Sequence, residues 1–472
     1  MKKIILLVLT LIVNLSYGQT EKADNKIITE KIVEHFNDDN YNGIFLMFAD
    51  ELKEALPIET TTEFLKNLKS QAGNITNQEF KKYENGTYAS YKTTFERGIF
   101  ALNISIDDNS KVNGLLVKPF AEEVNAENVI NNLSIKNSLT TSDQSEIIFE
   151  NTKIFPNNTQ LSIAIISNGK VRYYGIKKES DTISTIDNQK SIFEIGSISK
   201  VFTSTLLANF VIDGKVKLLD NINDYLKAPI KNSTEISFID LANHTSGLPR
   251  LPSNLDLINV DPENPYKEYK EKELEDYVTN QLELSNKGKY QYSNLGAGLV
   301  GYTLSKIEND TYESLLQHKI FSKYEMQNST TDITTIKGNL VKGLNNEGIE
   351  VPNWDLAVLA GAGAIFSTVE DLSQFAISQF EDKNKELELT RVKTFELNEN
   401  MDIGLGWHLL KNKSDNLWYF HNGGTGGYSS SMVLEEKSKN GIIILSNVSA
   451  FNPNMGNIDK LCFELMKTVE KE

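Results

Sequence analysis

Two Asn-Gly dipeptides, far apart in the chain, constrain the fold of its C-terminal part more than any other feature. Each lies between two apolar runs, and Asn-Gly in that setting is a strong short-range signal of a β-hairpin. The runs that flank positions 168–169 are residues 161–166 and 171–176, and those that flank positions 440–441 are residues 432–434 and 441–445. Mainly helical patterns lie between the two hairpins. The sequence therefore predicts one antiparallel sheet flanked by helices, plus a mostly helical subdomain.

A polar segment rich in Asn, Ser, Thr and Glu divides the chain, whose 472 residues suffice for two or three domains. Ahead of this segment, helical patterns precede strand patterns, which indicates a small α+β layer structure. The helical patterns cover residues 27–36, 41–56 and 61–71, and the strand patterns cover residues 88–95, 98–106 and 112–117. We therefore expect an α+β fold class, with a small domain over residues 20–120, a linker over 121–146 and a second domain over 147–472.

Residues 1–18 have the pattern of a signal peptide. Lys2 and Lys3 precede an apolar run over residues 4–13, and small residues such as Gly18 follow. The run is too short for a stable transmembrane anchor. We expect an exported protein, periplasmic or secreted, that is soluble after signal-peptide cleavage. The alternative is a buried N-terminal core helix.

Composition narrows the classes of partner. The net charge is −16, and there is no basic stripe, so nucleic acid and anionic membrane surfaces are poor candidate partners. A small-molecule or peptide substrate is expected instead. The single cysteine, Cys462, excludes an intramolecular disulfide and fits the apolar pattern of the last helix. The chain has no cysteine cluster and no H-E-x-x-H motif, so the sequence indicates neither a metal nor another cofactor.

The strongest chemical signal is a serine and a lysine at the start of an apolar helix. Ser197 opens a helical pattern that ends at Gly214, and Lys200 follows one turn later. Side chains three residues apart share a helix face, whereas Ser199 points elsewhere. Burial lowers the pKa of a lysine, which can then accept a hydroxyl proton, and a helix N-terminus favours an oxyanion. The spacing predicts Ser197 as nucleophile and Lys200 as its activator, although this short motif alone is weak evidence.

Two further segments contain residues that could act together with Ser197 and Lys200. Tyr292 and Asn294 lie between a polar loop and an apolar helix over residues 295–304. Tyr292 could act as a phenolate base if Lys200 supplied a nearby cation, and Asn294 could bind Lys200 and a substrate amide. Further along, a glycine-rich segment over residues 421–427 follows a strand, and glycines there allow a substrate backbone to approach closely.

Six stretches of the second module are similar to those of the serine β-lactamase and penicillin-binding protein superfamily, specifically its class C-like branch. In chain order they read FEIGSISKVFTS, LANHTSGLP, YSNLGAGLVGY, AGAGAIFSTVEDLSQF, GLGWHL and HNGGTGGYSS. That branch includes class C β-lactamases, D-alanyl-D-alanine carboxypeptidases and related esterases. The resemblance implies a β-lactamase-like domain and a metal-free hydrolase that forms an acyl-enzyme on an amide or ester substrate.

The resemblance also implies a role for each matching residue. Three would carry catalysis, with the serine acylated and the other two sharing the general-base work: Ser197, Lys200 and Tyr292. Four would bind the substrate, the last three as a triplet on the strand that edges the cleft: Asn294, His421, Asn422 and Gly423. The oxyanion hole would consist of two backbone N–H groups, those of Ser197 and Gly424.

The triplet departs from the family pattern at its first two positions. Class C β-lactamases have a lysine where this chain has His421, which is mostly neutral at pH 7, and Asn422 replaces a threonine hydroxyl. Both differences shift the expected substrate from a β-lactam toward a D-peptide or an ester. Two alternatives remain: an efficient class C-type β-lactamase, and a non-catalytic penicillin- or peptide-binding protein. His244, within NHTSGLP, is interpreted as part of a structural loop.

The first module is similar to the small cone-shaped, nuclear-transport-factor-2-like α+β domains found ahead of some bacterial serine hydrolases. The stretches that carry the likeness are FADELKEALP and FERGIFALNISIDDNSKVNGLLVKPF. This module contains no catalytic constellation, so its role is left open.

Overall fold

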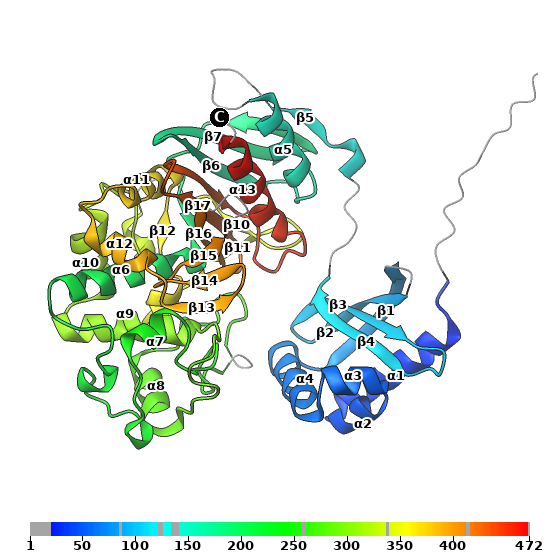
Figure 1. Ribbon diagram of the computed structural model, residues 1–472. Helices are drawn as coiled ribbons and strands as arrows, with labels where there is room; N and C mark the ends of the chain where they lie inside the picture. Colours follow the sequence, from blue (N-terminus) through cyan, green and yellow to red (C-terminus); the bar gives the residue numbers. More distant parts are fainter. Residues whose placement is uncertain are drawn as a thin grey trace, which may run out of the picture. The chain divides into compact units, whose positions relative to one another are not determined.

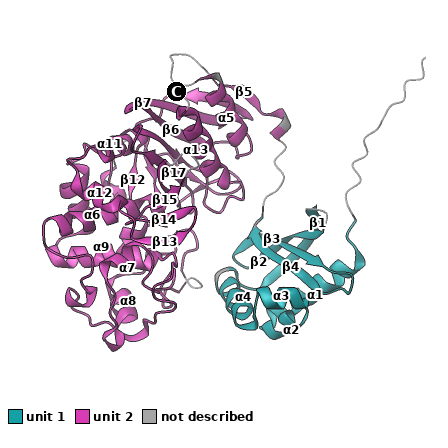
Figure 2. Ribbon diagram, in the orientation of Figure 1, with its two compact units in different colours: residues 1–120 teal, residues 121–472 magenta. Residues whose placement is uncertain are grey.

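The computed structural model describes residues 20–84, 87–120, 126–133, 141–256, 260–336, 339–411 and 416–470. The chain forms two compact units, residues 1–120 and residues 121–472, drawn in different colours in Figure 2. Both units combine helices with a largely antiparallel sheet, which confirms the expected α+β class. The predicted signal peptide, residues 1–18, lies outside the described residues.

The first unit packs four helices against a four-stranded antiparallel sheet with strand order β1-β2-β3-β4 (Figure 1). The helices are α1 (Ala23–Asn37), α2 (Tyr41–Leu46), α3 (Asp50–Ala55) and α4 (Ile58–Ala72). The strands are β1 (Ile75–Glu84), β2 (Tyr88–Phe95), β3 (Gly98–Ile106) and β4 (Val112–Pro119). Apolar side chains from α1, α2 and the sheet form one core, which includes Phe36, Ile44, Tyr91 and Ile104.

The first unit differs from the sequence expectation at two places. Strand β1 is not predicted, because its alternation is carried by polar and charged residues rather than by apolar ones. The helix expected over residues 41–56 is broken between α2 and α3, where the fully buried Phe48 forms a bridge to Val112 of β4. Backbone hydrogen bonds join Val112 to Met47 and Ala49, and these bonds replace the helical ones across the break.

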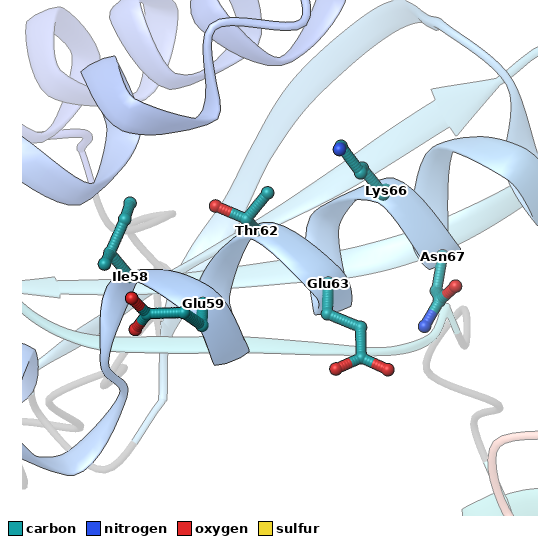
Figure 3. A pocket seen from close by; sticks show the side chains of 6 residues that line it. All are labelled: Ile58, Glu59, Thr62, Glu63, Lys66 and Asn67. Atoms are coloured by element: carbon teal, nitrogen blue, oxygen red, sulfur yellow. The ribbon is translucent and has the colours of Figure 1, made fainter. Parts of the chain in front are cut away.

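A hollow of about 460 Å³ runs along the outer face of α4 and is shown in Figure 3. Its lining side chains all come from this one helix: Ile58, Glu59, Thr62, Glu63, Lys66 and Asn67. None of the six is buried. The hollow is therefore lined by solvated side chains and does not shield a reaction site from water.

The second unit is built on a ten-stranded sheet with strand order β13-β14-β15-β16-β17-β18-β6-β7-β8-β5. The strands from the start of the unit are β5 (Ile130–Asn132), β6 (Gln160–Ser167), β7 (Lys170–Glu179) and β8 (Thr182–Ile186). Those from its end are β13 (Phe395–Asn398), β14 (Met401–Ile403), β15 (His408–Lys411), β16 (Leu417–Gly424), β17 (Ser429–Glu435) and β18 (Asn440–Ser446). Among the described strands of this sheet, β5 and β8 alone pair in parallel. The prediction of one sheet built from both ends of the segment is confirmed, because β18 pairs with β6.

Both faces of the large sheet are covered, so successive side chains of its central strands enter different cores. On one face Ile163 packs with α5 (Ser142–Thr152) and α13 (Gly456–Val469), and the predicted core residue Cys462 is fully buried there. On the other face Ala164 packs with the helical part of the unit. The helices of that part are α6 (Ser199–Ile212), α7 (Phe238–Ala242), α8 (Glu271–Asp276), α9 (Asn294–Glu308), α10 (Tyr312–Leu316), α11 (Val369–Gln379) and α12 (Lys385–Arg391). Two short strand pairs complete the unit: β9 (Phe193–Glu194) with β12 (Phe366–Ser367), and β10 (Gly343–Leu344) with β11 (Glu350–Val351).

The segment expected to be a linker, residues 121–146, carries part of the second unit. Strand β5 lies within it, and helix α5 begins at Ser142. Two polar residues of this segment, Thr141 and Gln144, cap helix α5. The Thr141 hydroxyl accepts a hydrogen bond from the Gln144 N–H at 3.2 Å, and the Gln144 side chain accepts one from the Thr141 N–H at 3.1 Å.

Candidate active site

Ser197 and Lys200 meet at the start of α6, as their spacing predicts. A 3-10 turn over Gly196–Ile198 leads from β9 into the helix. The Lys200 Nζ lies 3.0 Å from the Ser197 Oγ and donates a hydrogen bond to the Ala362 carbonyl at 2.7 Å. Ser199 points elsewhere, and its hydroxyl accepts a hydrogen bond from the Ile365 N–H. The geometry therefore selects Ser197 as the partner of the lysine.

The environment of Lys200 disfavours its charged form. The side chain is 2 % exposed, and none of the described carboxylates lies within ion-pair distance of it. Burial lowers the pKa of Lys200 well below its ordinary value, and the positive charge of Arg250 lowers it further. A neutral amine keeps a lone pair, so this group can accept a proton from the adjacent hydroxyl.

Tyr292 lies beside this pair, in the loop before α9. The Lys200 Nζ is 4.8 Å from the centroid of the Tyr292 ring, and the Arg250 guanidinium is 5.3 Å from it. Burial raises the pKa of Tyr292 to about 12, although a hydrogen bond with Ser197 and the charge of Arg250 oppose that shift. At neutral pH the phenol therefore keeps its proton, and it is suited to donate a proton rather than to act as the expected phenolate.

His244 contacts both Tyr292 and the residue that follows it. Its Nδ1 accepts a hydrogen bond from the Ser293 N–H at 3.2 Å, and its ring centroid lies 4.6 Å from that of Tyr292. The backbone of His244 has a φ of 64°, an uncommon conformation for a non-glycine residue. The stretch NHTSGLP is therefore more than a remote structural loop, because it contributes a side chain that contacts the tyrosine.

The triplet on β16 divides between the two faces of the sheet. His421 is buried near Tyr292, with 6.5 Å between the ring centroids, and its Nδ1 donates to the Asn422 carbonyl at 2.6 Å. The Asn422 amide donates instead to Asp459 of α13, at 2.7 Å. Successive side chains of a strand alternate between faces. The expectation that the Asn422 side chain binds substrate is therefore wrong, since it faces away from Ser197.

Glycines allow the end of β16 to approach the turn that carries Ser197. A Cβ atom on Gly196 would lie 2.5 Å from the Gly424 nitrogen, and one on Gly423 would lie 2.9 Å from the Ser197 nitrogen. Gly196 also has a φ of 51°, which glycine tolerates without strain. The N–H groups of Ser197 and Gly424, expected to form an oxyanion hole, are thus brought close together.

A pocket beside Ser197 is lined by the residues Gly196, Ser197, Tyr266, Asn294, Trp354, Leu356, Leu359, Ala362, Gly363, Gly424 and Thr425. The Asn294 side chain thus faces the same space as the nucleophile. Its amide oxygen is buried and accepts no hydrogen bond from a described residue, so the expected bond to Lys200 is not formed. That oxygen is available to a substrate N–H group.

Sequence reasoning misses four residues around this site. Tyr266 and Trp354 form an aromatic wall, with 5.3 Å between their ring centroids, and no local motif signals either residue. Arg250 reaches the Tyr292 ring from the loop that follows NHTSGLP. Glu194, an acid within the apolar start of FEIGS, is detectable from sequence: its buried carboxylate accepts from the Trp354 N–H at 2.9 Å and anchors that wall.

Within the described ranges, no group of three His, Cys, Asp or Glu side chains is arranged to hold a metal ion. His408 and His421 approach each other, with 5.3 Å between their ring centroids, and the Nε2 of His408 lies 3.0 Å from the Tyr290 hydroxyl. None of the helices in the described part of the chain is long and apolar enough to cross a membrane.

Comparison with known proteins identifies two families. The family described as Beta-lactamase matches residues 158–461, and the family described as Protein of unknown function (DUF3887) matches residues 29–115. The first match covers more than half of the chain and contains all of the candidate site residues. The second lies within the first unit.

Individual relatives agree with the first match. A beta-lactamase of Providencia stuartii is 32% identical over 163 residues, which are 33% of this chain and 38% of that protein. The D-alanyl-D-alanine-carboxypeptidase/endopeptidase AmpH of Escherichia coli K12 is 24% identical over 299 residues, 58% of this chain and 76% of that protein. The octameric penicillin-binding protein homologue from Pyrococcus abyssi has a similar fold, with a TM-score of 0.58, 21% identity, and coverage of 70% of this chain and 77% of that one. The chain belongs to the beta-lactamase family.

Proposed function

We propose that this protein is a serine hydrolase that forms an acyl-enzyme on Ser197. The observation that carries the proposal is the 3.0 Å distance between the Ser197 Oγ and the Nζ of a buried, uncompensated lysine. A serine hydroxyl becomes an effective nucleophile when an adjacent base takes its proton. Lys200 is that base in this proposal, because burial favours its neutral amine.

The proposed reaction proceeds in two balanced steps. The Ser197 O–H proton passes to the lone pair of Lys200 as the Oγ attacks the carbonyl carbon of an amide or ester. The developing oxyanion is held by the N–H groups of Ser197 and Gly424. When the tetrahedral intermediate collapses, the bond to the leaving group breaks, and the leaving group takes a proton relayed from Lys200 through the Tyr292 phenol. In the second step Lys200 takes a proton from a water molecule, whose oxygen attacks the acyl carbon. The bond between that carbon and the Ser197 Oγ then breaks, the Oγ takes the proton from Lys200, and the acyl group leaves as a carboxylic acid.

Labelling tests the proposal directly. Intact-mass measurement after incubation with a fluorophosphonate should show one adduct, located on the peptide that contains Ser197. Ser197→Ala should lose both the adduct and the hydrolysis of p-nitrophenyl acetate. Thr62→Ala on α4 is the matched control and should retain both. Hydrolysis by Ser197→Ala at the wild-type rate would refute the nucleophile assignment.

The preferred substrate in this proposal is a D-peptide or an ester. His421 is buried and its pKa is lowered well below the ordinary value by burial and by neighbouring His408 and Lys200. The position that holds a lysine in class C β-lactamases therefore offers no cation for a β-lactam carboxylate. The relative AmpH is named as a D-alanyl-D-alanine carboxypeptidase and endopeptidase, which supports the peptide assignment.

A panel of substrates separates the remaining alternatives. Rapid nitrocefin turnover would favour an efficient β-lactamase, and a long-lived penicillin adduct would favour a penicillin-binding peptidase. Absence of both labelling and turnover would indicate a non-catalytic binding protein. We further propose export of the protein, on the basis of the pattern at residues 1–18. N-terminal sequencing of the exported protein should find Met1 removed.

A further inference from the structure

Arg250 carries an exposed guanidinium at the edge of the candidate site. Among the residues that the structure describes, no carboxylate lies within ion-pair distance of it, and no hydrogen bond from its side chain is formed. By contrast, Arg97 lies 3.7 Å from Glu96, and Arg391 lies 3.0 Å from Glu436. An unpaired arginine is unexpected in a chain with 64 acidic and 48 basic residues.

Two sets of contacts place Arg250 beside the site. The Arg250 carbonyl accepts hydrogen bonds from the N–H groups of Asn294 at 3.0 Å and Leu295 at 3.2 Å, which ties its backbone to the start of α9. Its guanidinium carbon lies 5.3 Å from the centroid of the Tyr292 ring. In the proposed reaction Tyr292 relays a proton to the leaving group, so Arg250 lies on the leaving-group side of the site.

The basic groups near Arg250, which are Lys200, His244 and His421, are poorly suited to bind an anionic group of a substrate. The charges that act on Lys200, His244 and His421 all come from other basic groups, and burial disfavours the protonated form of each. His421 donates from Nδ1 to a backbone carbonyl, and its buried Nε2 has no partner among the described residues. The triplet therefore presents an acceptor, whereas a guanidinium such as that of Arg250 carries a positive charge and presents five donors.

We propose that Arg250 binds a carboxylate carried by the leaving group of the substrate. This inference rests on the proposed hydrolysis at Ser197 and specifies its substrate class. Arg250, which lies in the loop between α7 and α8, would take over the carboxylate attraction that the family resemblance assigns to a lysine at the His421 position on β16. A guanidinium matches a carboxylate with two parallel hydrogen bonds, which gives selectivity as well as affinity.

A pair of thioesters tests the assignment in the full chain. Both contain an N-benzoylglycyl acyl group; one leaving group is mercaptoacetate, and the other is its uncharged N-methylamide. Thiol release is followed with Ellman's reagent, and the buried Cys462 should give little background. Arg250→Gln should reduce kcat/KM for the charged thioester roughly tenfold or more, mainly through KM, and change that for the neutral one by less than about twofold.

Three variants complete the design. Arg250→Lys should retain part of the preference for the charged thioester, and Arg250→Glu should reverse it. Lys437→Gln removes one exposed positive charge beyond the far end of β17 and should leave both thioesters unaffected. Equal losses for both thioesters in Arg250→Gln, accompanied by a shifted pH profile, would overturn the proposal and assign Arg250 to the positioning of Tyr292. An unchanged preference would overturn it too.

The two proposals fail in distinguishable ways. Wild-type turnover of the neutral thioester that is lost in Ser197→Ala supports the hydrolase assignment whatever Arg250 does. If no thioester is cleaved and Ser197 is not acylated, the proposed function itself fails.

Discussion

The two units each place a hydroxyl and a lysine about one helical turn apart, in very different surroundings. On α4, Thr62 and Lys66 line an open hollow, and neither is buried (Figure 3). At the start of α6, Lys200 is 2 % exposed and lies 3.0 Å from the Ser197 Oγ. Spacing is similar in the two pairs, so spacing alone does not create a nucleophile. Burial distinguishes the two pairs, because it removes the water that would keep an amine protonated.

The largest expected effect concerns the two hydroxyls. Ser197→Ala should reduce kcat for an activated ester by several orders of magnitude, about 10⁶-fold when a nucleophile acts together with its base. Thr62→Ala should leave kcat unchanged, because its hydroxyl faces solvent. Steady-state assays of the two variants measure this difference. A similar loss in both variants would break the contrast between the units.

The second-largest effect on kcat is expected for the two lysines, Lys200 and Lys66. Lys200→Met should lower kcat by about 10³-fold, since the proton acceptor is lost, whereas Lys66→Met should not. The folded-state pKa of Lys200 lies well below the unfolded value of about 10.4, so the unfolded chain binds more protons between those values. Wild-type stability should therefore rise with pH through this window, and Lys200→Met should lack that rise. Urea titrations at several pH values would test it.

The aromatic wall gives an effect of intermediate size. Trp354 lines the pocket beside Ser197 and contacts Tyr266. Trp354→Ala should raise KM for an ester with an aromatic acyl group by roughly tenfold, because an apolar contact of that size is lost. KM for p-nitrophenyl acetate should change far less. Equal effects on the two esters would indicate that the wall does not contact the acyl group.

The smallest expected effect concerns two glutamates, Glu194 and Glu63, and it changes the free energy of unfolding rather than the activity. Burial raises the pKa of Glu194 to about 7 from an ordinary value of 4.5, although Thr425, Asn353 and Trp354 oppose the shift. The folded protein then binds more protons than the unfolded chain between those values, so stability should fall by about 3 kcal/mol as pH rises through them. Glu194→Gln should lack this fall, and Glu63→Gln on α4 should keep it. Thermal unfolding between pH 4.5 and 7.5 provides the measurement.

Local patterns predicted the site better than they predicted its surroundings. Ser197, Lys200 and Tyr292 are found from short motifs, because each motif fixes a local backbone shape as well as a residue type. The approach of His408 to His421 depends on the pairing of β15 with β16 and has no local signature. The side-chain direction of Asn422 follows from strand alternation, but only once the register of β16 is known.

The fold shows the same division between local and distant information. The turn at Asn168-Gly169 is predicted correctly, since a two-residue turn of that kind specifies its own register. Strands β17 and β18 form the second expected hairpin, but Asn440 and Gly441 lie within β18, paired with Glu435 and Leu434, so the expectation of a turn at these two residues is wrong. Strand β1 and the break around Phe48 are missed, because each is stabilised by pairing with a distant segment rather than by its own periodicity. Arg250 is missed for a related reason. No described carboxylate lies within ion-pair distance of it, and the sequence does not show which side chains surround it.

The pairing of β18 with β6 has a consequence for how the second unit folds. It aligns Ile443 with Ala164 in the middle of the sheet, so residues near the two ends of this unit must meet before its core can close. Contacts between residues so distant in sequence make folding slow. During synthesis, β6 emerges early and has one edge unpaired until β18 follows. The nascent chain thus exposes an apolar strand edge for much of its translation, a period in which a chaperone can keep it from aggregating.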